Sequence, residues 1–172
     1  LDGIADTDGR SGEATVRKNK SGIVVKGLHD LAVRFSRCCN PVPGDEIVGF
    51  VTRGRGVSIH RTDCINVINL PEDERGRLID AEWQVAENPT STEQYSTEIQ
   101  IFANNRIGLF ADISKVFTEK QIDITSMNVR TSKQGRATII MTFDIHGTEE
   151  LNRITDKIRQ IDGVLDIQRT TG

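Results

Sequence analysis

Three cysteines and a histidine are the residues of this chain best suited to chemistry. Cys38 and Cys39 are adjacent, and His60 precedes Cys64 by four residues. Three thiolates and an imidazole form a closed tetrahedral set for Zn²⁺, which leaves no position for water and indicates a structural ion. The alternative is that the cysteines are small buried residues and that His60 bonds a nearby carbonyl. The spacing leaves both interpretations open, because adjacent cysteines depart from the usual Cys-x₂₋₄-Cys pattern.

Catalysis by the same residues is a weaker interpretation. No third group stands at an obvious spacing to orient His60 in a nucleophilic Cys–His pair. Thiol redox chemistry favours Cys-x-x-Cys over adjacent cysteines. We therefore expect no reaction here, and a small Cys–His hydrolase is kept only as an alternative.

Arginines surround this motif: Arg34, Arg37, Arg53, Arg55 and Arg61. Gly54 and Gly56 keep the turn between two of them slim. Guanidinium groups on a narrow hairpin tip suit the phosphates of structured RNA. A solvated hairpin end is the alternative, and the net charge of −3 argues against general affinity for nucleic acids.

A second candidate site is the segment Ala103-Asn104-Asn105-Arg106-Ile107-Gly108-Leu109, between a predicted strand and a predicted helix. Gly108 lets the backbone approach a ligand, and a helix start offers free N–H groups to a carboxylate. Asn104 or Asn105 can both donate and accept, and Asp123 could receive an ammonium group. The loop therefore suits an α-amino acid, although a simple capping turn explains the glycine by itself.

Hydrophobic periodicity predicts the elements that position these residues. In the second half it predicts strands over 95–103, 122–131, 137–145 and 164–169. Helices are expected over 107–120 and from an N-cap at Thr148 to a stop at Gly163. The order β-α-β-β-α-β predicts a ferredoxin-like sandwich.

The first half is shorter and less regular. Strands are predicted over 23–25, 46–52, 57–60 and 78–83, with a short helix over 64–67 capped by Thr62 or Asp63. The acidic stretch 71–76 is predicted to be a surface loop. A small mixed α/β domain of this kind has marginal stability unless a cross-link such as a bound metal ion supports it. The fold class expected for the whole chain is α+β.

Composition bounds the remaining possibilities. The chain has 172 residues, 36% of them hydrophobic, with 22 basic and 25 acidic residues. No apolar run is long enough to span a membrane, the N-terminus has no signal peptide, and the odd cysteine count indicates a reduced, cytoplasmic setting. The start at Leu1 suggests a piece of a longer chain. We expect a flexible tail over 1–20, a Cys–His domain over 21–87, a linker over 88–94 and a second domain over 95–172.

Two stretches resemble known domains. Residues 21–86 resemble the conserved-cysteine domain (also called the zinc-finger or RIS domain) of long Rel/SpoT-type proteins, through residues 38–50, 52–61 and 63–64. Residues 95–172 resemble an ACT domain, the small-molecule-sensing βαββαβ module, through residues 105–109 and 122–124. The tandem is far more specific than an ACT domain alone.

The resemblance implies a non-catalytic, regulatory C-terminal fragment of a bifunctional GTP pyrophosphokinase/(p)ppGpp hydrolase. It implies that the fragment relays contact with the ribosome and uncharged tRNA to upstream catalytic domains in the stringent response. It also implies a structural zinc ion on Cys38, Cys39, His60 and Cys64. Contact with large-subunit ribosomal RNA is implied for the hairpin that carries Arg53, Arg55 and Arg61.

ACT domains typically pair side by side as homodimers and bind an amino acid at the interface. By position this implies one half-site of Asn104, Asn105, Arg106, Ile107, Gly108 and Leu109, facing Asp123 and Ile124 of a second copy. Ala103 and Asp123 stand where serine-sensing relatives have His and Asn, which favours a branched-chain ligand such as valine or isoleucine. The alternative is a purely structural dimerisation or docking module with no ligand.

Overall fold

The computed structural model describes residues 23–25, 32–54, 56–83 and 93–171. The chain divides into two compact units, one of residues 1–41, 45–91 and 171–172 and the other of residues 42–44 and 92–170. The predicted tail over 1–20 and residues 88–92 of the predicted linker lie outside the described residues.

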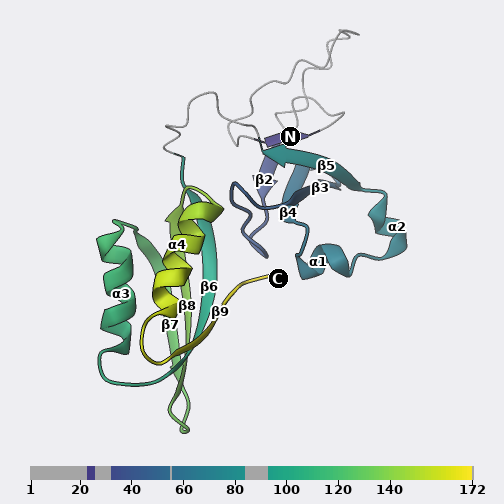
Figure 1. Ribbon diagram of the computed structural model, residues 1–172. Helices are drawn as coiled ribbons and strands as arrows, with labels where there is room; N and C mark the ends of the chain where they lie inside the picture. The colour runs from purple at the N-terminus through teal and green to yellow at the C-terminus, as the bar shows by residue number, and fades with distance from the viewer. Residues whose placement is uncertain (1–22, 26–31, 55, 84–92, 172) are drawn as a thin grey trace, which may run out of the picture. The chain divides into compact units, whose positions relative to one another are not determined.

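The first unit is built on a five-stranded sheet with the order β1-β5-β3-β4-β2. Its strands are β1 (Ile23–Val25), β2 (Val33–Phe35), β3 (Ile47–Thr52), β4 (Gly56–Arg61) and β5 (Leu78–Trp83) (Figure 1). The pairing of β2 with β4 is parallel, and the other pairings are antiparallel. Among its described residues the larger apolar cluster has five buried members, Ile23, Val25, Val57, Ile59 and Ala81, and a second cluster has Cys39, Cys64 and Val67.

Two short helices follow β4, and the predictions for this segment need correction. α1 (Ile65–Ile68) has Cys64 as its N-cap residue and no side-chain cap. Neither predicted cap is available, because the Thr62 hydroxyl donates to Glu46 and the Asp63 carboxylate pairs with Arg61. α2 (Glu72–Arg75) replaces the predicted loop, and three acidic residues in its first turn suit the positive end of a helix. The three-residue strand β2 was not predicted, since a charged residue interrupts its short apolar stretch, unlike the wholly apolar β1.

The second unit has the predicted β-α-β-β-α-β order. Its elements are β6 (Tyr95–Asn104), α3 (Leu109–Glu119), β7 (Ile124–Thr131), β8 (Arg136–Ile145), α4 (Thr148–Arg159) and β9 (Val164–Arg169). The sheet order is β7-β8-β6-β9, all antiparallel, and both helices cover one face of the sheet (Figure 1). The α+β fold class and the ferredoxin-like arrangement are thus confirmed.

The core of this unit follows from strict alternation along two neighbouring strands. Ile99 and Ile101 of β6 and Ile139 and Met141 of β8 are fully buried. Helical spacing places apolar residues of α3 and α4 against them, among them Ile113, Phe117, Leu151, Ile154 and Ile158. The two-residue period of the strands and the 3.6-residue period of the helices therefore place apolar side chains in one layer between the sheet and the helices.

The ends of α4 differ from the prediction. Gly147, not Thr148, is the N-cap residue. Instead of a hydroxyl cap, the Glu150 carboxylate reaches back and accepts the backbone N–H of His146 at 3.2 Å. The helix already ends at Arg159, and Gly163, at φ +98°, lies in the turn before β9.

Candidate functional site

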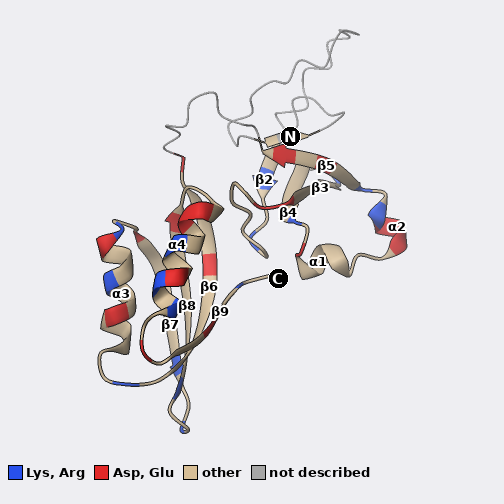
Figure 2. Ribbon diagram, viewed as in Figure 1, with Lys and Arg blue, Asp and Glu red and all other residues tan. Residues whose placement is uncertain are grey.

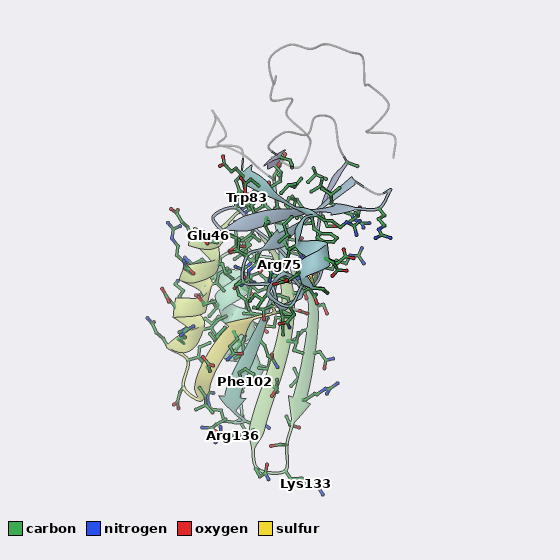
Figure 3. The ribbon with its side chains drawn as sticks, turned by 90° about the vertical axis from the view of Figure 1, so that its right-hand side faces the viewer. Glu46, Arg75, Trp83, Phe102, Lys133 and Arg136 are labelled. Carbon is green, nitrogen blue, oxygen red and sulfur yellow. The ribbon has the colours of Figure 1, made fainter. Side chains whose placement is uncertain are left out.

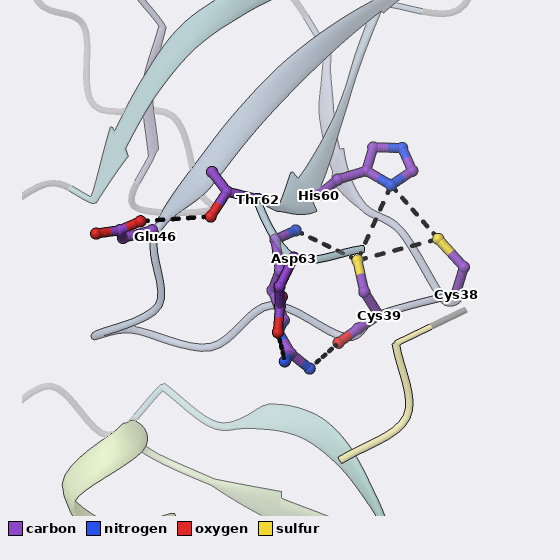
Figure 4. Close-up of polar contacts among 7 residues, drawn as sticks. Cys38, Cys39, Glu46, His60, Thr62 and Asp63 are labelled. Carbon is purple, nitrogen blue, oxygen red and sulfur yellow. Dashed lines mark hydrogen bonds and ion pairs between the residues drawn. The ribbon is translucent and has the colours of Figure 1, made fainter. Parts of the chain in front are cut away.

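The four predicted metal ligands lie together in the first unit. Their ligand atoms are all within 4.8 Å of one another. The Cys38 sulfur lies 4.0 Å from that of Cys39, 3.5 Å from that of Cys64 and 3.4 Å from His60 Nδ1. Cys39 Sγ is 3.9 Å from the same nitrogen, and Figure 4 shows both sulfurs turned toward the imidazole.

These separations match the edges of a zinc tetrahedron. Zn–S bonds of about 2.3 Å and Zn–N bonds of about 2.0–2.1 Å imply S···S edges of about 3.8 Å and S···N edges of about 3.6 Å. In the structure the sulfur–sulfur distances are 3.5 and 4.0 Å, and the sulfur–nitrogen distances are 3.4 and 3.9 Å. All three cysteines are free thiols. The residues present therefore fit a closed Cys₃His site.

A tight turn allows the adjacent residues Cys38 and Cys39 to face the same point. The Asn40 backbone N–H donates to the Ser36 carbonyl at 3.0 Å, which closes the turn around Cys38 and Cys39. Asn40 has φ +47°, a left-handed conformation that asparagine tolerates better than most residues. The turn aims both neighbouring thiols at one point, which spacing alone could not reveal.

His60 is oriented from its far side. Its Nε2 lies 2.9 Å from the Ser36 hydroxyl, while Nδ1 faces the sulfurs. Because Ser36 follows β2 and pairs with β4 through its N–H to the Ile59 carbonyl, the serine is fixed beside the ring. Nδ1 is therefore the atom that would bind a metal ion.

The surroundings of the cluster oppose nucleophilic chemistry. Burial raises the pKa of the Cys39 thiol well above its usual value, and the Arg61 N–H that bonds its sulfur only partly offsets this. Burial likewise raises the pKa of Cys64 and lowers that of His60. A nucleophilic cysteine needs the opposite, a thiol with a depressed pKa. A metal ion would supply the missing positive charge and bind the thiolates directly.

The arginines near the cluster fall into two groups. Arg61 is buried at 6% exposure, and its guanidinium donates to the Cys39 carbonyl and pairs with Asp63. This burial sets Arg61 apart from the exposed arginines, and its RNA contact stays a prediction. Arg34, Arg37 and Arg53 are exposed and form no ion pair among the described residues. The predicted contact residue Arg55 lies outside the described residues.

The β6–α3 loop of the second unit is held by its own arginine. Arg106 donates to the carbonyl of Asp162 at 2.7 Å, to that of Ile107 at 3.0 Å and to the Asp112 carboxylate at 2.7 Å. Gly108 is the N-cap of α3 at φ +83°, and no side chain caps the helix. Arg106 thus shapes the loop, while the start of α3 is left without a side-chain partner.

The other predicted loop residues differ widely in exposure. Asn104 and Asn105 are exposed, and Ile107 is 100% exposed. Leu109 is fully buried in the core, so it can offer a ligand only its backbone. Ile107 is consequently the one large apolar side chain of this loop that faces solvent.

Within one chain the two halves of the predicted amino-acid site lie apart. Asn104 is opposite Arg136 at the end of β8 near the β7–β8 turn, where Lys133 also lies (Figure 3). Ile124, next to the exposed Asp123, is opposite Phe143 near the other end of β8. Seven residues of strand separate these positions, about 24 Å. One copy of the chain therefore does not assemble the site.

Two family models match this chain. Residues 23–84 match the RelA/SpoT RIS domain. Residues 91–169 match the ACT domain. The chain carries a RelA/SpoT RIS domain followed by an ACT domain. The RIS match contains the whole Cys/His cluster, and the ACT match contains the β6–α3 loop.

Curated relatives agree with both matches. The chain is 40% identical over 150 residues to a GTP pyrophosphokinase of Streptomyces coelicolor, covering 87% of this chain and 17% of the relative. It is 36% identical over 156 residues to the GTP pyrophosphokinase of Escherichia coli K12, covering 90% of this chain and 20% of the relative. The chain spans about a fifth of the length of these relatives. It matches the RIS/ACT regulatory region of GTP pyrophosphokinases and not their catalytic domains.

Among solved structures, the ACT domain of the Chlorobium tepidum GTP pyrophosphokinase is similar at 22% identity and a TM-score of 0.41, covering 45% of this chain and 99% of that one. In the described part of the RIS–ACT chain, every helix is too short or too polar to cross a membrane.

Proposed function

We propose that this chain is the regulatory region of a bifunctional GTP pyrophosphokinase/(p)ppGpp hydrolase that acts in the stringent response in the cytoplasm. Its RIS domain docks on large-subunit ribosomal RNA when uncharged tRNA is present, and its ACT domain pairs with a second copy and senses an amino acid. The region relays both contacts to upstream catalytic domains and contacts no membrane. The observation that carries this proposal is the zinc-fitting Cys₃His cluster within a RIS–ACT tandem.

Zinc would have a structural role in the RIS domain. Cys38, Cys39, Cys64 and His60 Nδ1 would hold it. The ion would then tie the turn after β2, the end of β4 and the start of α1 to one point. Such a link suits a unit whose larger apolar cluster has five buried members among the described residues. It would keep the neighbouring arginines in a fixed arrangement.

The exposed arginines are the proposed RNA surface of the RIS domain. Arg53 lies in the β3–β4 turn, Arg34 in the edge strand β2 and Arg37 in the turn that carries the cysteines (Figure 2). Arg34 pairs in register with Ser58 of β4, so the strands and the turn belong to one framework. Unpaired guanidiniums on a rigid framework can bind phosphates without first breaking an internal ion pair.

Replacing Arg34, Arg37 and Arg53 together with alanine is expected to weaken binding to the large ribosomal subunit at least ten-fold. The slope of log affinity against log salt concentration should fall by about one for each phosphate that the variant no longer binds. Filter binding at several salt concentrations measures both quantities.

The matched control for the arginine triple replaces Lys115, Arg153 and Lys157, three exposed cations of the ACT helices, with alanine. It removes the same charge and should leave the salt slope unchanged. Equal losses of affinity in the two triple variants would contradict a specific RIS surface and would indicate a general effect of charge.

The proposed amino-acid site requires an ACT homodimer. β7 is an edge strand with two apolar side chains, Met127 and Val129, more than a third exposed. In a two-fold symmetric, antiparallel pairing of β7 with its copy, the start of one strand lies beside the end of the other. Thr131, at the end of β7, is opposite Ala137 of β8, and Ala137 pairs with Ala103 of β6, so the end of β7 lies near the β6–α3 loop. The proposed strand pairing would therefore bring Asp123 of the partner subunit, which precedes β7, toward that loop.

Valine or isoleucine should bind this dimeric site, with the carboxylate at the start of α3 and the ammonium on Asp123. An amide NMR titration should show saturable shifts at residues 105–109 and 123 with these ligands and none with serine. Asp123→Ala should weaken binding at least ten-fold, whereas Asp156→Ala on the exposed face of α4 should not. Flat spectra at millimolar ligand would leave the ACT domain as a dimerisation or docking module only.

A further inference from the structure

We propose that Ser36 and Arg61 are positioning residues that hold the Cys/His cluster ready for its metal ion. This inference rests on the proposed zinc site and adds two side chains that bind no metal themselves. Ser36 contacts the back of the histidine ligand, and Arg61 contacts the backbone and sulfur of a cysteine ligand. Ser36 follows β2, and Arg61 is the last residue of β4.

Ser36 determines which imidazole nitrogen faces the sulfurs. Its hydroxyl lies 2.9 Å from His60 Nε2. Its backbone N–H donates to the Ile59 carbonyl, and its carbonyl accepts the Asn40 N–H. When Nε2 keeps its proton and donates it to this hydroxyl, the lone pair is left on Nδ1, 3.4 Å from Cys38 Sγ. A hydrogen bond on the far nitrogen is the usual way in which proteins fix the tautomer of a metal-binding histidine.

Arg61 fixes Cys39 at two atoms. Its backbone N–H lies 3.3 Å from the Cys39 sulfur, and one guanidinium nitrogen lies 3.3 Å from the Cys39 carbonyl oxygen. The second contact reaches across to the turn that holds the adjacent cysteines. A lysine could replace the charge but not the fixed planar fork of donors that spans this turn and Asp63.

The charge of Arg61 also suits a loaded site. Three thiolates, a neutral imidazole and a divalent ion carry a net charge of −1. The Arg61 side chain is 7% exposed, whereas that of its carboxylate partner Asp63 is 56% exposed, so water shields the acid more than the guanidinium. A buried cation is costly unless a nearby negative charge compensates it. The loaded cluster would provide that compensation.

Titration of the reduced 172-residue chain with Zn²⁺ against a chromophoric chelator tests the inference. Ser36→Ala and Arg61→Lys should each lower zinc affinity 10- to 100-fold, the range typical of residues that support metal ligands. Ser36→Thr, which keeps the hydroxyl, should restore most of the affinity. In addition, ¹⁵N NMR of the loaded chain should show His60 bound through Nδ1 with a proton on Nε2, and Ser36→Ala should broaden or shift that proton signal.

Two controls separate positioning from general loss of structure. Ser58→Ala removes the hydroxyl of a buried serine of β4, and Arg77→Lys changes another arginine of the same unit, which pairs with Glu74. Both should keep the affinity of the unchanged chain. The inference is overturned if the unchanged chain binds zinc and both Ser36→Ala and Arg61→Lys bind it equally well. If the unchanged chain binds no zinc, the zinc site itself is refuted, and this inference with it.

Discussion

The Cys64→Ser variant is expected to lose tight zinc binding and most of the stability of the RIS unit, while its ACT unit stays folded. Binding of structural zinc contributes about 10–16 kcal/mol in small zinc domains, and this energy is coupled to folding. Among the described residues the RIS unit has two small buried clusters, of five and three members, whereas the ACT core is continuous between sheet and helices. We therefore expect the RIS unit to lose several kcal/mol of its free energy of unfolding.

The single tryptophan makes the measurement specific to one unit. Trp83 stacks on Phe35 of β2 with ring centroids 5.5 Å apart, and both residues belong to the RIS unit. Urea unfolding followed by tryptophan fluorescence therefore reports the RIS unit, while NMR signals of α3 and α4 report the ACT unit. The variant should unfold at lower urea in the fluorescence experiment only.

A zinc chelator provides the matched control for Cys64→Ser. It should lower the stability of the unchanged RIS unit nearly to that of the variant and should have little effect on the variant itself. A chelator effect of the same size on both proteins would contradict the metal staple. So would a variant as stable as the unchanged chain.

The ACT half could be predicted from sequence because its patterns are long. Ten-residue strands with strict alternation, such as β8, and helices with a clear apolar face each repeat their period several times. What failed there was local. Thr148 has the side chain of an N-cap, but the back-reaching Glu150 serves the helix end instead.

The RIS half was harder because its elements are short and its contacts are tertiary. The four ligand residues could be named from their types, yet the turn that unites Cys38 with Cys39 depends on a left-handed Asn40. Arg61 has the same residue type as the exposed Arg53, and only its position on β4 turns it inward. Ser36 gave no sequence signal, since a lone serine before two cysteines has no characteristic spacing.

A second large loss of stability is expected from replacing one of two glycines of the β3–β4 hairpin. Gly54 and Gly56 have nearly the same backbone conformation, with φ +80° and +81°. Alanine at either position should therefore lower the free energy of unfolding by about 1–2 kcal/mol, because it must adopt a left-handed conformation. Their surroundings differ sharply. A Cβ at Gly54 would meet no atom of a described residue within 4 Å, whereas a Cβ at Gly56 would overlap the Ala32 carbonyl oxygen.

Gly56→Ala is thus expected to destabilise the RIS unit by about 3–5 kcal/mol, against about 1–2 kcal/mol for Gly54→Ala. The Ala32 carbonyl accepts the Val57 N–H at 2.8 Å, so moving it breaks the bond that joins the residue before β2 to β4. Because β2 leads directly into Ser36 and the two cysteines, zinc affinity should fall in Gly56→Ala and stay nearly unchanged in Gly54→Ala. Urea unfolding followed by Trp83 fluorescence, together with zinc titration, measures both effects. Equal stability losses in the two variants would show that backbone conformation alone sets the cost, and that β2 does not depend on the close approach at Gly56.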